Sequence, residues 1–113
     1  MTYFQSFAQD KILGIWNSEN SEAKIQIYQI DRLIYGKIVS VLDPKNSSKV
    51  GLVILLGFNP IGFQYINGTI IEPRHNHKAK GTLTLSQDGN TLKVKGTALF
   101  GLISKTEIWT KIN

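Results

Sequence analysis

Gly14-Ile15-Trp16 is the stretch that decides the fold of this 113-residue chain, and a second tryptophan, Trp109, lies close to its end. A Gly-x-Trp at the entrance to a chain of strands, with a tryptophan in the last strand, indicates a small closed barrel. In such a barrel the first and last strands meet, and a large aromatic side chain plugs one end. We expect Trp16 to be such a plug, with its indole N–H hydrogen-bonded to a neighbouring group and a lysine, Lys105 or Lys111, over an indole ring.

Apolar and polar residues alternate with a period of two along most of the chain. Gly81, Leu83 and Leu85, for example, are separated by threonines, which indicates a half-buried strand with its apolar face inward. Short turns separate such segments and predict sequential antiparallel pairing, which is an all-β, up-and-down β-barrel. The expected strands are residues 12–18, 23–30, 33–42, 50–58, 62–66, 69–73, 79–86, 91–98 and 103–112.

The strand count depends on how the turn signals are interpreted. Asp88-Gly89-Asn90 predicts a hairpin, because Asp-Gly supplies the positive φ angles that tight turns need. Asn59-Pro60 predicts another turn. Asn67-Gly68 predicts either a hairpin turn or a bulge within one longer strand. The barrel is therefore expected to have eight or nine strands.

The chain length predicts one domain, which we place at residues 12–113. Residues 1–11 form either a short arm against the barrel, with a helical turn within residues 3–10, or the remnant of a signal peptide. Ser6 and Ala8 stand before Asp10 in a small-x-small frame like that of a cleavage site, although the basic start of a complete signal is missing. We favour export over the arm.

The composition excludes several classes of function. The net charge is +5, but only two of the 13 basic residues, Arg32 and Arg74, are arginine, so no nucleic-acid partner is expected. The chain has no cysteine, and so no disulfide, thiolate metal site or cysteine nucleophile. No apolar run is long enough to form a membrane-spanning helix.

No catalytic, metal or cofactor site emerges from the sequence. His75 and His77 have the i, i+2 spacing that lets two imidazoles reach one metal, with Glu72 as the only acidic residue nearby. Arg74 and Lys78 would repel a cation there, so we interpret both histidines as solvated loop residues. No nucleophile elbow and no phosphate-binding glycine motif is present. The chain is therefore expected not to be an enzyme.

Two non-enzymatic functions fit the pattern. The first is a binding module that takes a small apolar or amphipathic ligand at the barrel mouth, where aromatic side chains would line the site. The second is a protein–protein or anionic-surface interaction module whose barrel is filled by its own side chains, because an eight-stranded barrel has little spare interior. The predicted ligand-binding residues are Trp16, Tyr28, Tyr35, Phe63, Tyr65 and Trp109.

Two surfaces would serve the interaction function. Residues 50–58 are apolar at almost every position, so Val53 and Leu55 are expected to form a second apolar face, covered within the chain or by another copy in a homo-oligomer. Lysines on the polar faces of two strands would form a basic stripe facing solvent or an anionic surface. This stripe comprises Lys78, Lys80, Lys93 and Lys95.

Blocks along the chain resemble the DUF2147 family of small bacterial proteins. They include Gly14-Ile15-Trp16, Tyr35-Gly36-Lys37-Ile38 and Trp109-Thr110-Lys111. The resemblance implies a calycin barrel like those of lipocalins and streptavidin, exported to the periplasm or cell envelope, and it brings no established activity or catalytic residue. The chain departs from the family pattern at Glu72, Asn76 and Ala79, where the pattern has Asp, Gly and an aromatic residue. The small Ala79 would free volume or open a surface there.

Overall fold

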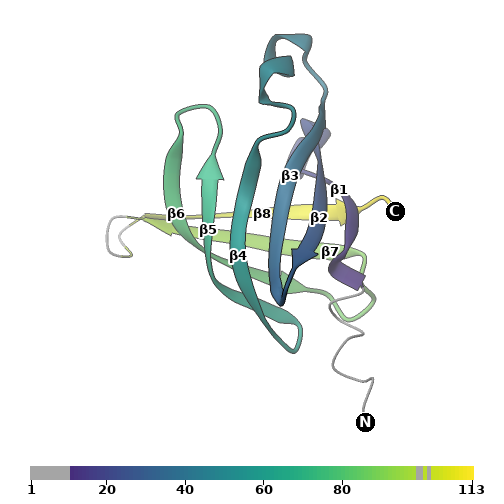
Figure 1. The fold of residues 1–113 in the computed structure, drawn as a ribbon, viewed down its shortest axis with the longest axis vertical. Helices are drawn as coiled ribbons and strands as arrows, with labels where there is room; N and C mark the ends of the chain where they lie inside the picture. The colour runs from purple at the N-terminus through teal and green to yellow at the C-terminus, as the bar shows by residue number, and fades with distance from the viewer. Residues whose placement is uncertain (1–10, 99–100, 102) are drawn as a thin grey trace.

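The computed structural model describes residues 11–98, 101 and 103–113 and shows a closed antiparallel barrel of eight strands (Figure 1). Each strand pairs with the next, and β8 pairs with β1, which confirms the up-and-down topology. Among the elements fully within the described residues, η1 (Glu19–Ser21) and η2 (Pro44–Lys49) are 3₁₀ helices that lie in connections. The strands are β1 (Gly14–Asn17), β2 (Ala23–Ile30), β3 (Leu33–Val41), β4 (Val53–Ile61), β5 (Gln64–Glu72), β6 (His77–Leu85), β7 (Thr91–Ala98) and β8 (Ile103–Lys111).

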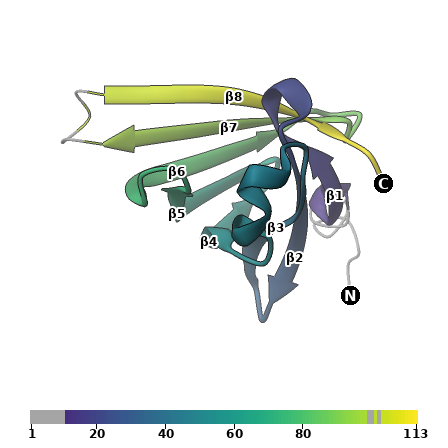
Figure 2. The same ribbon diagram turned by 90° about the horizontal axis from the view of Figure 1, so that it is seen from above.

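The arm or signal remnant predicted for residues 1–11, including its helical turn, falls almost wholly outside the described residues. Within the described part, no helix is both long enough and apolar enough to cross a membrane. The β7 and β8 strands run together on one side of the barrel, across from β2 and β3 (Figure 2).

The Gly14-Ile15-Trp16 segment closes the barrel. Trp16 lies opposite Lys111 in the β1–β8 pair, and Ile15 N donates a hydrogen bond of 2.8 Å to Asn113 O. Gly14 has a φ of 128°, and a Cβ at this position would collide with the carbonyl oxygen of Asn113. Only glycine lets the last residues pack this close to the first strand, so the glycine in the motif has a direct structural cause.

A bulge accounts for the strand count of eight. Asn67 has a φ of 61° inside β5, and the β5–β6 register shifts between Tyr65 and Gly68. The two predicted strands, 62–66 and 69–73, are therefore one bulged strand. The hairpin predicted at Asp88-Gly89-Asn90 is confirmed: the Asp88 carboxylate accepts hydrogen bonds from Asn90 N at 2.9 Å and Ser86 Oγ at 2.7 Å.

The turn predicted at Asn59-Pro60 is wrong, because both residues lie inside β4. Pairing between β3 and β4 ends at Phe58, so beyond this point the missing N–H of Pro60 removes no bond to β3. The chain instead turns at Gly62 and Phe63, where Gly62 has a φ of 62°.

The facing predicted for Leu55 is also wrong. The strand begins at Val53, and the adjacent residues Ile54 and Leu55 are both buried, because the β3–β4 register shifts on both sides of Gly36. A bulge lets two successive side chains point inward, which strict alternation does not allow. Leu55 is fully buried within the chain and is no part of a second apolar face.

Large side chains fill one half of the barrel. Phe58 lies against the paired glycines Gly68 and Gly81, where an added Cβ would collide with its ring. This close approach lets an aromatic ring cross the interior of a narrow barrel. The fully buried large residues of the barrel also include Trp16, Leu55, Tyr65, Leu83 and Leu92.

Candidate functional site

The other half of the barrel contains a cavity of about 650 Å³. Its mouth is formed by η1 with the start of β2, the β5–β6 turn and the first residues of β8. Its inner wall is apolar, because inward-facing branched residues from five strands meet there. The wall includes Ile25, Ile38, Ile54, Ile70, Val94 and Trp109.

Small residues leave the space that this cavity occupies. Ala79 on β6 and Gly96 on β7 line the cavity, and a Cβ at Gly96 would come within 3.3 Å of the Ala79 methyl group. In the filled half, the equivalent interior is crossed by the ring of Phe58. An eight-stranded barrel can hold its own side chains or one small ligand, and this barrel does the first at one end and has room for the second at the other.

Charged side chains surround the mouth and connect its elements. Arg74 Nη2 in the β5–β6 turn lies 3.0 Å from Glu22 Oε2, beside the start of β2. Glu19 in η1 accepts a hydrogen bond of 2.9 Å from Ile108 N on β8. A smaller polar depression of about 210 Å³ shares the Glu22–Arg74 pair with the cavity. These exposed contacts add little stability, but they place polar groups around an apolar interior.

Trp109 links the wall of the cavity to this rim. Its indole Nε1 donates a hydrogen bond of 3.0 Å to Glu107 Oε1, and Glu107 Oε2 lies 3.7 Å from Lys105 Nζ. The ring is almost completely buried, while Glu107 and Lys105 line the mouth. An amphipathic molecule in the cavity would therefore meet an aromatic ring and a carboxylate on the same strand.

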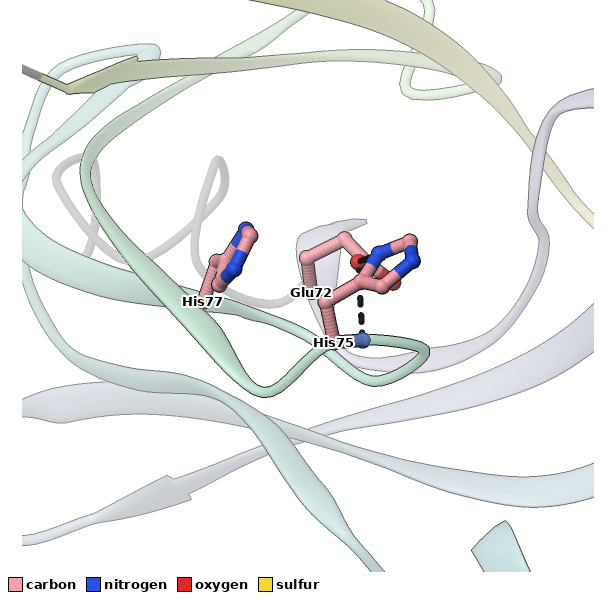
Figure 3. A group of neighbouring side chains, drawn as sticks. All are labelled: Glu72, His75 and His77. Atoms are coloured by element: carbon pink, nitrogen blue, oxygen red, sulfur yellow. Dashed lines mark hydrogen bonds and ion pairs between the residues drawn. The ribbon is translucent and has the colours of Figure 1, made fainter.

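Glu72, His75 and His77 form a compact group at the mouth, and their side chains project to the same side of the β5–β6 turn (Figure 3). Glu72 Oε1 lies 2.7 Å from His75 Nδ1 and accepts a 3.0 Å hydrogen bond from His75 N. The rings of His75 and His77 stack with centroids 5.4 Å apart. Partial burial alone would raise the pKa of Glu72, but hydrogen bonds from Arg74 N and His75 lower it overall.

The structure does not bring the six predicted mouth residues together. Only Trp109 lines the cavity. Trp16 and Tyr65 are fully buried core residues. Phe63 is 41% exposed in the β4–β5 turn.

Tyr28 and Tyr35 stack on each other at 5.9 Å on the outer surface of β2 and β3, with Lys37 over the ring of Tyr28. Their outward position follows from the pleat, because Ile25 and Ile27 face inward on the same strand as Tyr28. The alternation in the sequence already contained this signal. The prediction chose aromatic residues by type and did not apply strand facing to them.

The sequence prediction missed the aliphatic wall of the cavity and the hydrogen bond between Glu72 and His75, although it named Glu72 as the acidic residue near the two histidines. Facing could have identified Ile25 and Val94, which stand on cleanly alternating strands. Ile54 could not be placed this way, because the β4 bulge is not visible in the sequence.

The fold and the half-open interior define the class of the protein: a closed, eight-stranded antiparallel barrel of the lipocalin-like kind. Protein HP1028 from the human pathogen Helicobacter pylori, described as belonging to the lipocalin family, has a similar solved structure with a TM-score of 0.74. The alignment covers 90% of this chain and 83% of that one at 15% sequence identity, a likeness that shows the fold alone. No curated protein matches the sequence.

The family model described as "Uncharacterized protein conserved in bacteria (DUF2147)" matches residues 14–111. The chain therefore belongs to the DUF2147 family, which confirms the resemblance of its sequence blocks.

Proposed function

We propose that this protein binds one small apolar or amphipathic molecule in the cavity at the open end of the barrel. The observation that carries the proposal is a cavity of about 650 Å³ with an aliphatic and aromatic wall and a charged rim. Ligand sites in proteins occupy about 300–1,000 Å³ and combine apolar walls with a few polar groups that orient the ligand. Lipocalin-like barrels of eight strands have room for such a ligand.

The arrangement supports a non-enzymatic role. Among the described residues that line the cavity, the apolar wall carries no nucleophile, and the hydroxyl, imidazole and carboxylate groups lie at the rim. Burial of apolar surface would provide the affinity, at roughly 25 cal/mol per Å² removed from water. The rim groups would set the orientation of a polar head.

Trp109 provides the signal for the first test. A panel of fatty acids and aromatic amphiphiles is titrated into the protein while tryptophan fluorescence is recorded. Binding in the cavity should shift the emission, and Trp109→Phe should abolish the shift, because Trp16 is buried outside the cavity wall. A panel without any saturable change would contradict the proposal.

A blocked cavity provides the matched comparison. Ala79→Trp places an indole in the open half of the barrel, whereas Ile61→Trp adds the same side chain at a 60% exposed position near the β4–β5 turn. We expect Ala79→Trp to weaken binding about tenfold or more, since about 1.4 kcal/mol corresponds to tenfold. Ile61→Trp should bind as the wild type does. Equal binding by both variants would place the ligand elsewhere.

The lysines on the outer surface are the feature that bears on the second role, contact with an anionic surface. Lys80, Lys93 and Lys95 are exposed on paired β6 and β7, with Lys95 opposite Thr82 and Lys80 opposite Thr97, so the lysines follow one another along the ladder. Contact with an anionic surface through the predicted stripe stays a prediction. Homo-oligomerisation and export to the periplasm or cell envelope also stay predictions, and light scattering and cell fractionation would test them.

A further inference from the structure

We propose that Glu72, His75 and His77 bind one zinc ion at the mouth of the cavity. The three residues each offer a ligand atom, and these atoms lie within 4.8 Å of one another (Figure 3). Imidazole nitrogen and carboxylate oxygen are ligands that zinc takes in proteins. The site depends on the β5–β6 turn and not on what occupies the apolar cavity.

The turn places the donors in one group from a short segment of chain. Glu72 ends β5, His77 begins β6, and these two residues are partners in the β5–β6 ladder. His75 returns over them because Asn76 adopts a left-handed φ of 57°. The carboxylate and both rings consequently face the same side, and all three residues line the mouth.

The existing contacts fit a cation with a modest rearrangement. His75 Nδ1 and Glu72 Oε1 face each other across 2.7 Å, and a metal between them would replace the hydrogen that they share. Donors around a tetrahedral zinc, with bonds of about 2.1 Å, lie about 3.4 Å apart. Both side chains of this pair are partly exposed, with 68% of the His75 and 36% of the Glu72 side chain accessible, so they can make the adjustment.

Arg74 and Lys78 also line the mouth, and two features of the structure reduce the repulsion of a cation by their charges. The Arg74 guanidinium pairs with Glu22 at 3.0 Å, so its charge is partly neutralised by a carboxylate outside the cluster. Lys78 follows His77 on β6, and successive side chains of a strand point to opposite faces. Arg74 and Lys78 therefore repel a cation at this site less strongly than their positions in the sequence suggest.

Three protein ligands leave the fourth position of a tetrahedral zinc for water or a ligand group. This position would lie at the entrance of the cavity. A zinc ion bound here would therefore offer a coordination site for an anionic group beside the apolar cavity.

The test is calorimetric titration of zinc chloride into the full chain without an affinity tag, with magnesium chloride as the oxygen-preferring control. We expect one zinc per chain and no magnesium binding. His75→Ala, His77→Ala and Glu72→Gln should each weaken zinc binding about tenfold or more, because even outer partners of a metal site are worth about 10–100-fold. Lys80→Ala removes an exposed lysine on the same strand but outside the cavity lining, and it should leave the affinity within about twofold of the wild type.

Nuclear magnetic resonance of the wild type gives a readout that needs no variant. The chain has two histidines, so the ring nitrogen signals are few, and both should shift together as one zinc binds. An absence of saturable zinc binding up to millimolar concentration would overturn the proposal. So would zinc binding that survives the two histidine substitutions, or a Glu72→Gln variant that binds zinc like the wild type. Loss of zinc binding with unchanged fatty-acid binding would leave the proposed function intact, and the reverse result would leave the metal site intact.

Discussion

Trp16 connects the start and the end of the chain through both packing and hydrogen bonds. Its ring is fully buried, and its Nε1 donates a 2.8 Å hydrogen bond to Ile12 O. Lys111 Nζ lies 5.0 Å from the ring centroid and donates to Leu13 O at 2.7 Å and to Lys11 O. Burial lowers the pKa of Lys111. The plug, its satisfied indole and a lysine over the ring were all predictable from residue types, because a buried tryptophan requires a partner for its N–H.

Tyr65 in the closed half is suited to a substitution test. Its ring is fully buried, and its hydroxyl has no hydrogen-bond partner among the described residues. A buried hydroxyl without a partner costs about 1–3 kcal/mol, so Tyr65→Phe should leave the free energy of unfolding unchanged or raise it by about 1 kcal/mol. Urea denaturation of both proteins at neutral pH measures this difference. A loss of more than about 1 kcal/mol would show that the hydroxyl is satisfied.

The same residue predicts a pH dependence. Burial raises the pKa of Tyr65, whereas a tyrosine in the unfolded chain ionises near pH 10. Below pH 10 the hydroxyl is neutral in both states and contributes no pH dependence. Above pH 10 the unfolded state loses the proton and the folded state keeps it, so the free energy of unfolding should fall as the pH rises. Tyr65→Phe should decline less steeply, and parallel curves would contradict the assignment.

Gly68 tests the packing of Phe58. A Cβ at Gly68 would overlap the Phe58 ring, so Gly68→Ala should lower the free energy of unfolding by about 1–3 kcal/mol through overpacking. Gly96→Ala is the matched control, because its Cβ would lie 3.3 Å from the Ala79 methyl group at the open half. Chemical denaturation should show the larger loss for Gly68→Ala. Equal losses would contradict the close approach of the ring.

At the scale of elements, β-bulges determine which side chains face inward at positions where the sequence pattern did not predict it. Clean alternation on β2, β6 and β7 predicted correctly which side chains of these strands face inward. The Asp88-Gly89 signal predicted the hairpin that joins β6 and β7. The β4 strand differs, because its register shifts twice against β3 and places Ile54 and Leu55 inward together. A register shift depends on pairing with a strand elsewhere in the chain, so local pattern does not reveal it.

Asn67 in the β5 bulge gives a direct test of this idea. Its φ of 61° is tolerated by asparagine and glycine but strained for β-branched residues. Asn67→Val should cost about 1–2 kcal/mol in the free energy of unfolding, whereas Asn67→Gly should be nearly neutral. Thermal denaturation of the two variants measures the contrast. A stable Asn67→Val protein would mean that β5 pairs without the bulge.

At the scale of the whole molecule, the barrel is divided into a filled half and an open half. The sequence predicted the closed all-β barrel, since turns and alternation are local signals, and it left open whether the interior was filled. The division depends on where glycines and large aromatics meet across strands: Phe58 against Gly68 and Gly81 at one end, Ala79 beside Gly96 at the other. Such pairs become visible only when the register of distant strands is known. The predicted aromatic mouth therefore missed a cavity walled mostly by aliphatic residues.

Ligand binding in the open half is the central claim, and the isoleucines of the chain report on it directly. Ile25, Ile38, Ile54 and Ile70 line the cavity, whereas Ile12, Ile27 and Ile34 are buried outside its lining. Ile30 and Ile61 are exposed and serve as surface controls.

The decisive measurement is a methyl-detected magnetic resonance titration of isoleucine-labelled protein with the tightest-binding amphiphile of the fluorescence panel. Binding in the cavity predicts saturable shifts concentrated on Ile25, Ile38, Ile54 and Ile70, with Ile27 and Ile34 little changed. Shifts confined to exposed Ile30 and Ile61, or no shift at saturating amphiphile, would contradict a binding function for the open half of the barrel.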